Sequence, residues 1–231
     1  MTTVTPASLL SNERAREDDR YTRDAPEIPG LVGTSWLHQR RAYADAMSRP
    51  ATMLAMGMGS GKTRVAIGCI LNRPDVRRVL ILCPLSVVPV WPAEFEKHSH
   101  IRPVEIFFST RDSSVADKTQ RAKASGSWIV VINYESARAE PFRSWSLGAG
   151  FDMVICDESQ KIKAPAGVGS RYVSALGKRA KYRLCLTGTP ISHGILDLYS
   201  QYRFLDPTVF GTSFLLYKLR YAVMNPYVPQ M

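Results

Sequence analysis

Residues 52–68 read TMLAMGMGSGKTRVAIG, an apolar run that passes through a glycine-rich loop into a helix-like segment. A strand, a glycine-rich loop and a helix in this order are typical of proteins that bind nucleotide phosphates, because glycines let backbone N–H groups converge on phosphate oxygens. Lys62 and Thr63 follow the last glycine, where an ammonium can reach the β- and γ-phosphates and a hydroxyl can bind Mg²⁺. The strict pattern GxxxxGK[ST] is not met, because Met56 stands where its first glycine would be.

The composition of the chain is that of a soluble globular protein. Its 231 residues are 45% hydrophobic and 22% charged, which predicts one domain with a substantial core. A formal charge of +10 favours a polyanionic partner, nucleic acid first. The first residues contain no apolar run typical of a secretion signal, and no apolar stretch is long enough to span a bilayer. We therefore expect a cytoplasmic protein without a membrane partner.

Neither the cysteines nor the histidines form a pattern typical of a metal site. Each of the four cysteines lies in an apolar segment, and we expect them to be buried thiols in a reducing compartment: Cys69, Cys83, Cys156 and Cys185. His98 and His100 have the spacing of an HxH metal pair. No other ligand cluster completes a site, so a solvated helix end is the favoured interpretation.

Short apolar runs alternate with stretches of helical length from residue 36 onward. The predicted strands are residues 51–56, 78–83, 104–108, 128–132, 152–156 and 183–187, and the predicted helices are residues 62–71, 88–99, 114–124, 133–145 and 170–180. Continuous apolar strands separated by helices indicate a parallel sheet that is covered on both faces. The fold class is therefore α/β, with a mostly parallel central sheet whose ligands are bound at the carboxyl ends of the strands.

Two further predicted strands end in chemically useful residues. The strand at residues 152–156 leads into Asp157 and Glu158. One carboxylate beside phosphate oxygens and waters suits Mg²⁺, and the second can orient and deprotonate an attacking water. The strand at residues 183–187 leads into Thr187-Gly188-Thr189-Pro190, which by itself would be read as an ordinary helix cap.

These segments, in this order and spacing, resemble the first motor lobe of the superfamily 2 helicases, in which the phosphate loop reads AxxGxGKT and needs no glycine at Met56. The sequence is most similar to the Swi/Snf-type translocases. VLILCPLSVVPVWPAEFEKH, VVINYESARA, ICDESQKIKAP, LCLTGTPIS and LYSQYRFLDPTVFGTSFLLYKLRY each resemble a segment of that family, and the similarity covers residues 37–221. The resemblance implies a RecA-like P-loop NTPase lobe that uses ATP and Mg²⁺.

The resemblance also implies a role for each matching residue. Gln39 matches the glutamine that reads adenine, and Trp36 is expected to pack nearby, with stacking on the base as the alternative. The nucleotide is expected to lie on Met58, Gly59, Ser60, Gly61, Lys62 and Thr63, with Thr63 and Asp157 on Mg²⁺ and with Lys62, Asp157 and Glu158 in catalysis. Thr187, Gly188 and Thr189 match residues that couple the nucleotide to nucleic acid. Pro84, Ser86, Asn133, Tyr134, Lys161 and Lys163 are the expected contacts to sequence-nonspecific, duplex DNA.

The chain departs from the family pattern in two places. Gln160 replaces the histidine of the DEAH segment, and Ser192-His193 replaces QN after TGTP, so coupling of ATP to movement is the less secure inference. The DESQ variant resembles phage and bacterial members, which implies the cytoplasm of a bacterial or phage-infected cell. No QxxGRxxR-like segment occurs, so a second RecA-like lobe is expected in cis or in trans.

The expected organisation is a disordered segment at 1–27, an ATP-binding domain at 28–207 and the start of a C-terminal extension at 208–231. Three functions remain open. The first, which we favour, is the ATP-binding lobe of a nucleic-acid-dependent ATPase. The alternatives are a nucleotide-dependent DNA- or partner-binding module without efficient turnover, and an unrelated P-loop enzyme such as a phosphotransferase.

Overall fold

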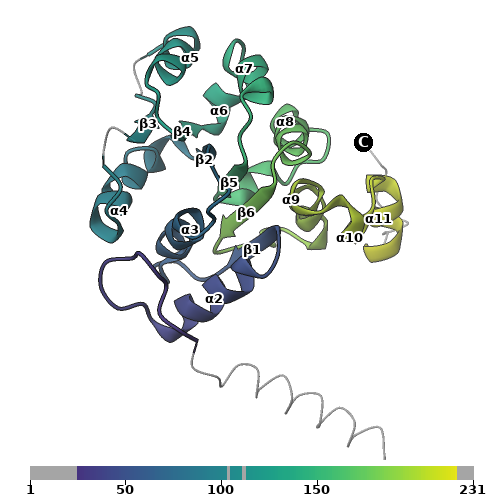
Figure 1. Cartoon of the computed structure of the whole chain (residues 1–231). Helices are drawn as coiled ribbons and strands as arrows, with labels where there is room; N and C mark the ends of the chain where they lie inside the picture. Colours follow the sequence, from purple (N-terminus) through teal and green to yellow (C-terminus); the bar gives the residue numbers. More distant parts are fainter. Residues whose placement is uncertain (1–24, 103–104, 111–112, 223–231) are drawn as a thin grey trace, which may run out of the picture.

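The computed structural model describes residues 25–102, 105–110 and 113–222 (Figure 1). The disorder expected at the N-terminus falls almost wholly on residues 1–24, outside the described part. Of the described residues in this segment, Ala25 O accepts from Arg40 NH1 at 2.8 Å, and Glu27 Oε2 accepts from Ser35 N at 2.9 Å. The domain boundary predicted after residue 207 stays a prediction.

A six-stranded, all-parallel sheet forms the centre of the described structure, as predicted. Its strands are β1 (Ala51–Ala55), β2 (Val79–Cys83), β3 (Ile106–Phe108), β4 (Ile129–Asn133), β5 (Met153–Asp157) and β6 (Tyr182–Thr187). They lie in the order β1-β6-β5-β2-β4-β3. The sequence located all six strands, because strands buried on both faces are continuous apolar runs that need no other signal.

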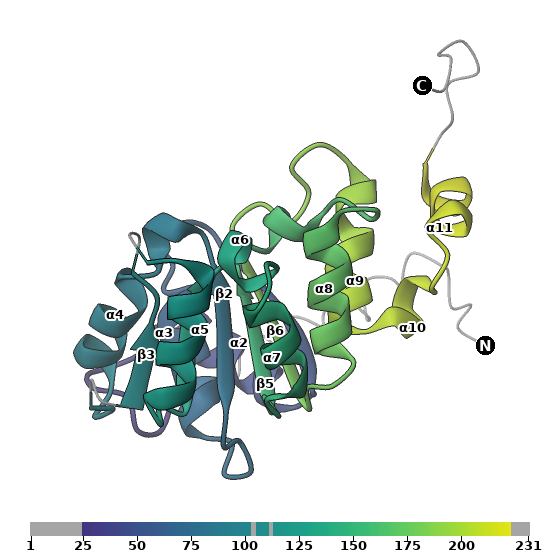
Figure 2. The ribbon, with the colours of Figure 1, turned by 90° about the horizontal axis from the view of Figure 1, so that it is seen from above.

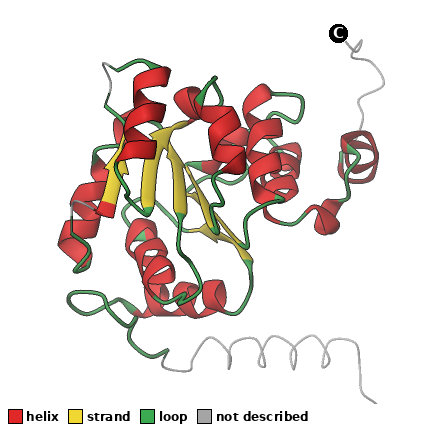
Figure 3. Cartoon of the chain, turned by 45° about the horizontal axis from the view of Figure 1, so that its top comes forward, coloured by secondary structure: helices red, strands yellow, loops and turns green. Residues whose placement is uncertain are grey.

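Helices cover both faces of the sheet, which gives three layers (Figures 1 and 3). On one face lie α2 (Leu37–Met47), α3 (Lys62–Leu71) and α4 (Val90–His98), with the short turn η1 (Leu85–Val87) before α4. On the other lie α5 (Val115–Ala124), α6 (Tyr134–Ala137), α7 (Phe142–Gly148), α8 (Val168–Gly177) and α9 (Leu198–Leu205). The 3-10 turn η3 (Ser159–Ile162) follows β5, and the 3-10 turn η4 (Ile195–Asp197) precedes α9.

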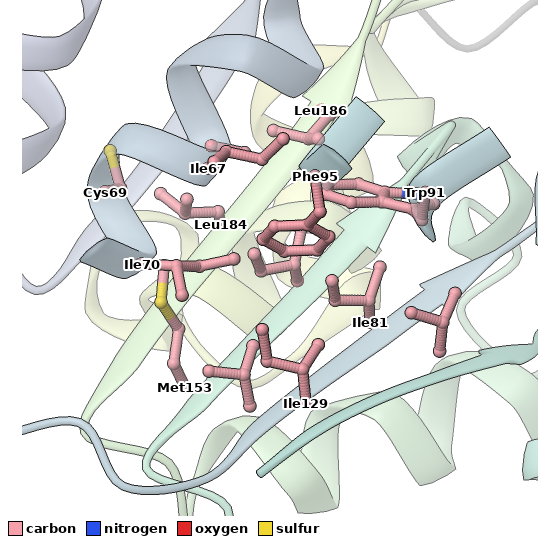
Figure 4. Close-up of a cluster of buried hydrophobic side chains, with 14 of the residues drawn as sticks. Ile67, Cys69, Ile70, Ile81, Trp91, Phe95, Ile129, Met153, Leu184 and Leu186 are labelled. Atoms are coloured by element: carbon pink, nitrogen blue, oxygen red, sulfur yellow. The ribbon is translucent and has the colours of Figure 1, made fainter. Parts of the chain in front are cut away.

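Alternate side chains of each strand pack into two separate hydrophobic cores. Ile81, Ile129 and Met153 point toward α3 and α4, where they meet Ile70 and Phe95 (Figure 4). Their sequence neighbours point into the second core beneath α5 to α9. All four cysteines are buried, as predicted, and burial raises the pKa of each thiol.

The structure differs from the sequence prediction in its helices, since α2 and α9 were not among those predicted. The single helix predicted at residues 133–145 is two short helices, α6 and α7, because Pro141 removes a backbone donor and restricts the residue before it. Beyond α9, residues of the expected extension form α10 (Pro207–Phe210) and α11 (Phe214–Tyr221). Figure 2 shows that α11 lies apart from the sheet and the helices that cover it. In the part of the chain that is described, no helix is long and apolar enough to cross a membrane.

Gly177 provides a test of the packing between α8 and α9. A Cβ there would lie 2.7 Å from both Cδ2 and the carbonyl oxygen of Phe204. We expect Gly177→Ala to lower the free energy of unfolding by roughly 1–3 kcal/mol, since the clash with backbone outweighs the better helix propensity of alanine. Urea denaturation measures the change.

Gly148→Ala is the matched control, because Gly148 also ends a helix but has open space where the Cβ would lie. Alanine there should be neutral or stabilising by up to about 1 kcal/mol. Equal effects of the two substitutions would contradict the packing argument.

Candidate functional site

The order of the strands brings the phosphate loop and the two carboxylates together. β6 lies between β1 and β5, so the loop after β1 and the residues that end β5 meet at one edge of the sheet. A cavity of about 590 Å³ opens there. It is lined by Thr34, Trp36, Gln39, Met58, Gly59, Gly61, Lys62, Thr63, Arg64, Val87, Val90, Glu94, Lys97, His98, Asp157 and Glu158.

Two glycines of the loop are required by its geometry. Gly59 and Gly61 have φ values of 72° and 84°, in the left-handed region that favours glycine. A Cβ on Gly61 would also lie 2.3 Å from Nε2 of Gln39, so a side chain there would displace the Gln39 amide from its position. Gly57, the first glycine of the loop, has neither a positive φ nor a close neighbour.

Lys62 is the first residue of α3, and its ammonium is held in the loop. Nζ donates to the carbonyl oxygens of Met56 and Gly57, both at 3.0 Å. Met56 N in turn donates to Thr187 O at 3.2 Å, which ties the loop to the end of β6. Because Met56 serves through its backbone and packs its side chain against the core, glycine is not needed there.

Asp157 ends β5 as a buried carboxylate. Trp91 Nε1 on α4 donates to Oδ2 and Glu158 N donates to Oδ1, both at 3.0 Å. Burial raises the pKa of Asp157 to about 6, although these hydrogen bonds and the nearby Lys62 act in the opposite direction. Trp91 is itself fully buried, and its bond to Asp157 is a contact that the sequence could not predict.

Glu158 has a backbone conformation that non-glycine residues rarely adopt. Its φ and ψ are 50° and 56°, and its side chain lines the cavity. Such a conformation costs free energy and persists where surrounding structure enforces it, as at functional sites. Gln160 Nε2 donates to Glu158 Oε2 at 2.7 Å and fixes the direction of this carboxylate.

Thr187, Gly188 and Thr189, which were expected to couple the nucleotide to nucleic acid, do not line the cavity. Hydrogen bonds through Gln160 connect Thr187 to Glu158, which does line it. Thr187 is fully buried, and its hydroxyl donates to Gln160 Oε1 at 2.8 Å. The same hydroxyl accepts from Thr189 N at 3.0 Å. Gln160 therefore links Glu158 to the end of β6 through both ends of its amide. This glutamine, which the sequence treated as a departure that weakened the coupling inference, makes a direct connection.

The structure places Gln39 and Trp36, which were expected near the base, at the cavity, but it does not place there Ser60, which was expected in the phosphate loop. Gln39 lines the cavity, but its amide already accepts from Trp36 N at 3.1 Å and donates to Ser60 O at 3.0 Å. Ser60 does not line the cavity, and its hydroxyl bonds to Gly57 O instead. Trp36 is 62% exposed and lines the cavity, so it does not pack in the core, and stacking on the base stays a prediction.

The residues at this cavity fit ATP and Mg²⁺. The Thr63 hydroxyl and the Asp157 carboxylate both line it, and oxygen ligands of this kind suit Mg²⁺. No group of three or more His, Cys, Asp or Glu side chains that could hold a metal occurs among the described residues. His98 instead bonds to Arg64, at 2.8 Å from Nδ1 to NH1.

A second cavity, of about 800 Å³, lies at the ends of β2, β3 and β4. Its lining includes four of the six residues expected to contact nucleic acid: Pro84, Ser86, Asn133 and Lys161. Glu135 lines it too, and accepts from Asn133 Nδ2 at 3.0 Å. Asn133 is 4% exposed, and its Oδ1 has no hydrogen-bond partner within the described ranges.

The other two expected nucleic-acid residues lie elsewhere. Tyr134 is buried, and its hydroxyl donates to Asp157 O at 2.8 Å, so it cannot contact DNA directly. Its side chain points inward because it starts α6 on the core side of the chain. Lys163 does not line the second cavity and lies 3.8 Å from Asp197, in contact with His193. Alternate residues on a 3-10 turn point in different directions, which separates Lys163 from Lys161.

One wall of the nucleotide cavity was missed by the sequence. Glu94, Lys97 and His98 of α4 face it, and so does Arg64 of α3. Glu94 and His98 are one helical turn apart, which indicates a shared face but not what that face covers. Arg64 directly follows Lys62-Thr63, a position that carried no signal of its own.

The raised pKa of Asp157 predicts a pH-dependent effect on stability. A carboxyl whose pKa is higher in the folded state adds stability below its unfolded pKa, and this stability is lost as the pH rises through about 6. Asp157→Asn removes this dependence. Between pH 5 and pH 8 the variant should therefore gain about 1–1.5 kcal/mol of unfolding free energy relative to the parent. Urea titrations at both pH values test this, and a constant difference would contradict it.

Comparison with known proteins agrees with this geometry. The sequence profile of the SNF2-related domain matches residues 31–222. A RAD54-like DNA repair and recombination protein of Drosophila erecta is 28% identical over 178 residues, which are 70% of this chain and 22% of that protein. Helicase ssl-1 of Caenorhabditis elegans is 29% identical over 168 residues, 69% of this chain and 7% of that protein.

The chain thus spans about a fifth or less of these curated relatives. Among solved structures, the Sulfolobus solfataricus SWI2/SNF2 ATPase core in complex with dsDNA superposes with a TM-score of 0.73 at 25% identity. That superposition covers 87% of this chain and 41% of the other. The fold is the RecA-like one that the sequence predicted, and the chain belongs to the family of SNF2-related domains.

Proposed function

We propose that this chain is the ATP-binding lobe of a DNA-dependent ATPase of the helicase or translocase type. One observation carries the proposal. A single cavity is lined by residues from two places about a hundred residues apart in the chain: Lys62 and Thr63, at the start of α3, and Asp157 and Glu158, at the end of β5. Proteins that resemble the chain are described as DNA repair proteins, as a helicase and as an ATPase core with dsDNA.

The loop and its helix would bind the phosphates of ATP. Backbone N–H groups at Gly59 and Gly61 and the positive end of α3 favour negative charge. Lys62 would exchange its carbonyl partners for the β- and γ-phosphates. Thr63 and Asp157 would hold Mg²⁺, whose charge neutralises the phosphate oxygens. Gln39, with one amide hydrogen and one lone pair still free, would bond the adenine edge.

Glu158 would orient the attacking water and take its proton as the bond to the γ-phosphorus forms and the bond to ADP breaks. Gln160 positions this carboxylate and links it to Thr187. A change at the γ-phosphate would thus reach the end of β6 through two side-chain hydrogen bonds. This connection supports coupling in a chain that lacks the usual histidine.

The second cavity would bind DNA. Lys161 is exposed at its rim, Ser86 and Thr110 supply hydroxyls, and the chain carries a net charge of +10. Such contacts hold phosphates without reading sequence, so binding should be nonspecific and salt-dependent. A duplex is the favoured substrate, since the similar Sulfolobus structure is a complex with dsDNA.

The proposed ATPase lobe would work with a second lobe, in a bacterial or phage-infected cell. A second RecA-like lobe would supply arginines that stabilise the transition state. The DESQ variant at Gln160 supports a phage or bacterial type, in the cytoplasm. The alternative function, a nucleotide-dependent binding module without efficient turnover, uses the same residues and differs only in hydrolysis.

Two lysines should separate the two binding activities. Lys62→Ala should abolish most ATP affinity while DNA affinity stays near that of the parent, because Lys62 lines only the nucleotide cavity. Lys161→Ala should leave ATP affinity unchanged and reduce the slope of log K against log salt for duplex DNA by about 0.9. Calorimetry with ATP and fluorescence anisotropy with labelled duplex measure both. Loss of both activities in either variant would overturn the assignment of separate sites.

Hydrolysis should distinguish the proposal from its alternative. The 231-residue chain should bind ATP but hydrolyse it slowly, since a trans-acting arginine is worth about 10³–10⁵ in rate. Adding a second lobe with the arginine segment should restore DNA-stimulated phosphate release, and Glu158→Gln should abolish it again. Glu96→Gln, an exposed carboxylate on α4 outside both cavities, is the control. No stimulation by the added lobe would favour the binding module.

A further inference from the structure

The geometry points to Arg64 as a positioning residue that sets the base end of the nucleotide site. Its guanidinium holds residues 32–36, hereafter the base-side loop, against the helix that begins with Lys62 and Thr63. The inference rests on the proposed ATP site and extends it, because it names a residue that controls recognition of the nucleoside rather than of the phosphates.

The guanidinium of Arg64 is surrounded by acceptors from the base-side loop. NH1 donates to Val32 O at 2.9 Å, and NH2 donates to Gly33 O at 2.7 Å. Nε and NH2 both lie within reach of Ser35 Oγ, at 3.4 and 3.2 Å. Arg64 is only 7% exposed, yet it lines the nucleotide cavity. A buried charge of this kind is stable only while its hydrogen-bond partners stay in place.

The end of α4 also contacts Arg64, through His98. Arg64 NH1 contacts His98 Nδ1 at 2.8 Å, and Val32 N donates to His98 O at 2.9 Å. Glu94 lies on the other side of the His98 ring, at 3.4 Å from Nε2. The base-side loop, the start of α3 and the end of α4 therefore meet around one side chain.

The residues that Arg64 holds in position face the nucleotide cavity. Thr34 lies between the bonded residues Gly33 and Ser35 and lines the cavity, as does Trp36. Trp36 N donates to Gln39 Oε1, so the loop also orients the glutamine expected to read the base. Arg64 follows Thr63 directly, so the phosphate end and the base end of the cavity are separated by a distance that this guanidinium fixes.

Arg73, two residues beyond the end of α3, offers a matched comparison. It is also 7% exposed, and its NH2 donates to Ala46 O and Arg49 O at 2.7 and 3.1 Å. It does not line the nucleotide cavity. Loss of either arginine removes a buried guanidinium from carbonyl partners, but only Arg64 touches the base-side loop. The two positions therefore separate a role in nucleoside recognition from a role in stability alone.

The test compares two ligands on the full 231-residue chain by calorimetry with Mg²⁺: ATP and inorganic triphosphate. Arg64→Lys keeps the charge, but the single nitrogen of an ammonium cannot reach acceptors that are spread around the planar guanidinium: Val32 O, Gly33 O, Ser35 Oγ and His98 Nδ1. We expect ATP affinity to fall about tenfold and triphosphate affinity to change by less than about twofold. Arg73→Lys should leave the ratio of the two affinities at the value of the parent. Ser35→Ala, which removes one acceptor, should reduce ATP affinity selectively and by a smaller factor.

Hydrogen exchange supplies a readout that needs no nucleotide. The amides of residues 32–36 should exchange faster in Arg64→Lys than in the parent or in Arg73→Lys. The inference is overturned if Arg64→Lys lowers both affinities equally, if it lowers neither, or if the Arg73 variant changes the ratio as much. A parent chain that binds neither ligand would refute the proposed function itself, whereas an unchanged ratio in a chain that binds ATP refutes only the role of Arg64.

Discussion

The parallel pairing of β6 with β1 on one side and β5 on the other is the interaction on which the rest of the site depends. Thr187 lies opposite Ala55, and Leu186 lies opposite Asp157, so the three strands end at nearly the same level. The phosphate loop and the carboxylates follow directly from these ends. A shift of one residue in either register would turn every side chain of β6 to the opposite face, which the two separate cores do not allow.

Part of the site is held at a cost in folding free energy. Asp157 is kept in a buried position that disfavours its charge, and Glu158 adopts a left-handed backbone conformation. Neighbouring groups enforce both, with Trp91 and Glu158 N on the first carboxylate and Gln160 on the second. Binding of Mg²⁺ and nucleotide would offset the cost, because a nearby cation favours the ionised carboxylates.

Two cavities lie along the edge of the sheet where the strands end. The nucleotide cavity lies at the ends of β1 and β5, and the second cavity lies at the ends of β2, β3 and β4. Tyr134 connects them: its neighbours Asn133 and Glu135 line the second cavity, while its hydroxyl bonds to Asp157 O. The buried tyrosine hydroxyl is thus one hydrogen bond from the backbone of Asp157, the residue proposed to hold Mg²⁺.

The sequence by itself determined the strands, the phosphate-loop helix, the burial of the cysteines and the main members of both cavities. The strands, the helix and the carboxylates follow from local patterns, since buried parallel strands are apolar runs and loop chemistry follows the strand ends. Gln39 and the residues of the second cavity were instead implied by the resemblance to the Swi/Snf-type translocases. The sequence could not place Tyr134, Lys163 or Ser60 correctly, and it gave no signal for Arg64 or for the bond from Trp91 to Asp157. Those positions depend on strand order and on the rotation of helices about their axes. Only packing between segments far apart in the chain sets these two quantities, so only the tertiary structure could decide them.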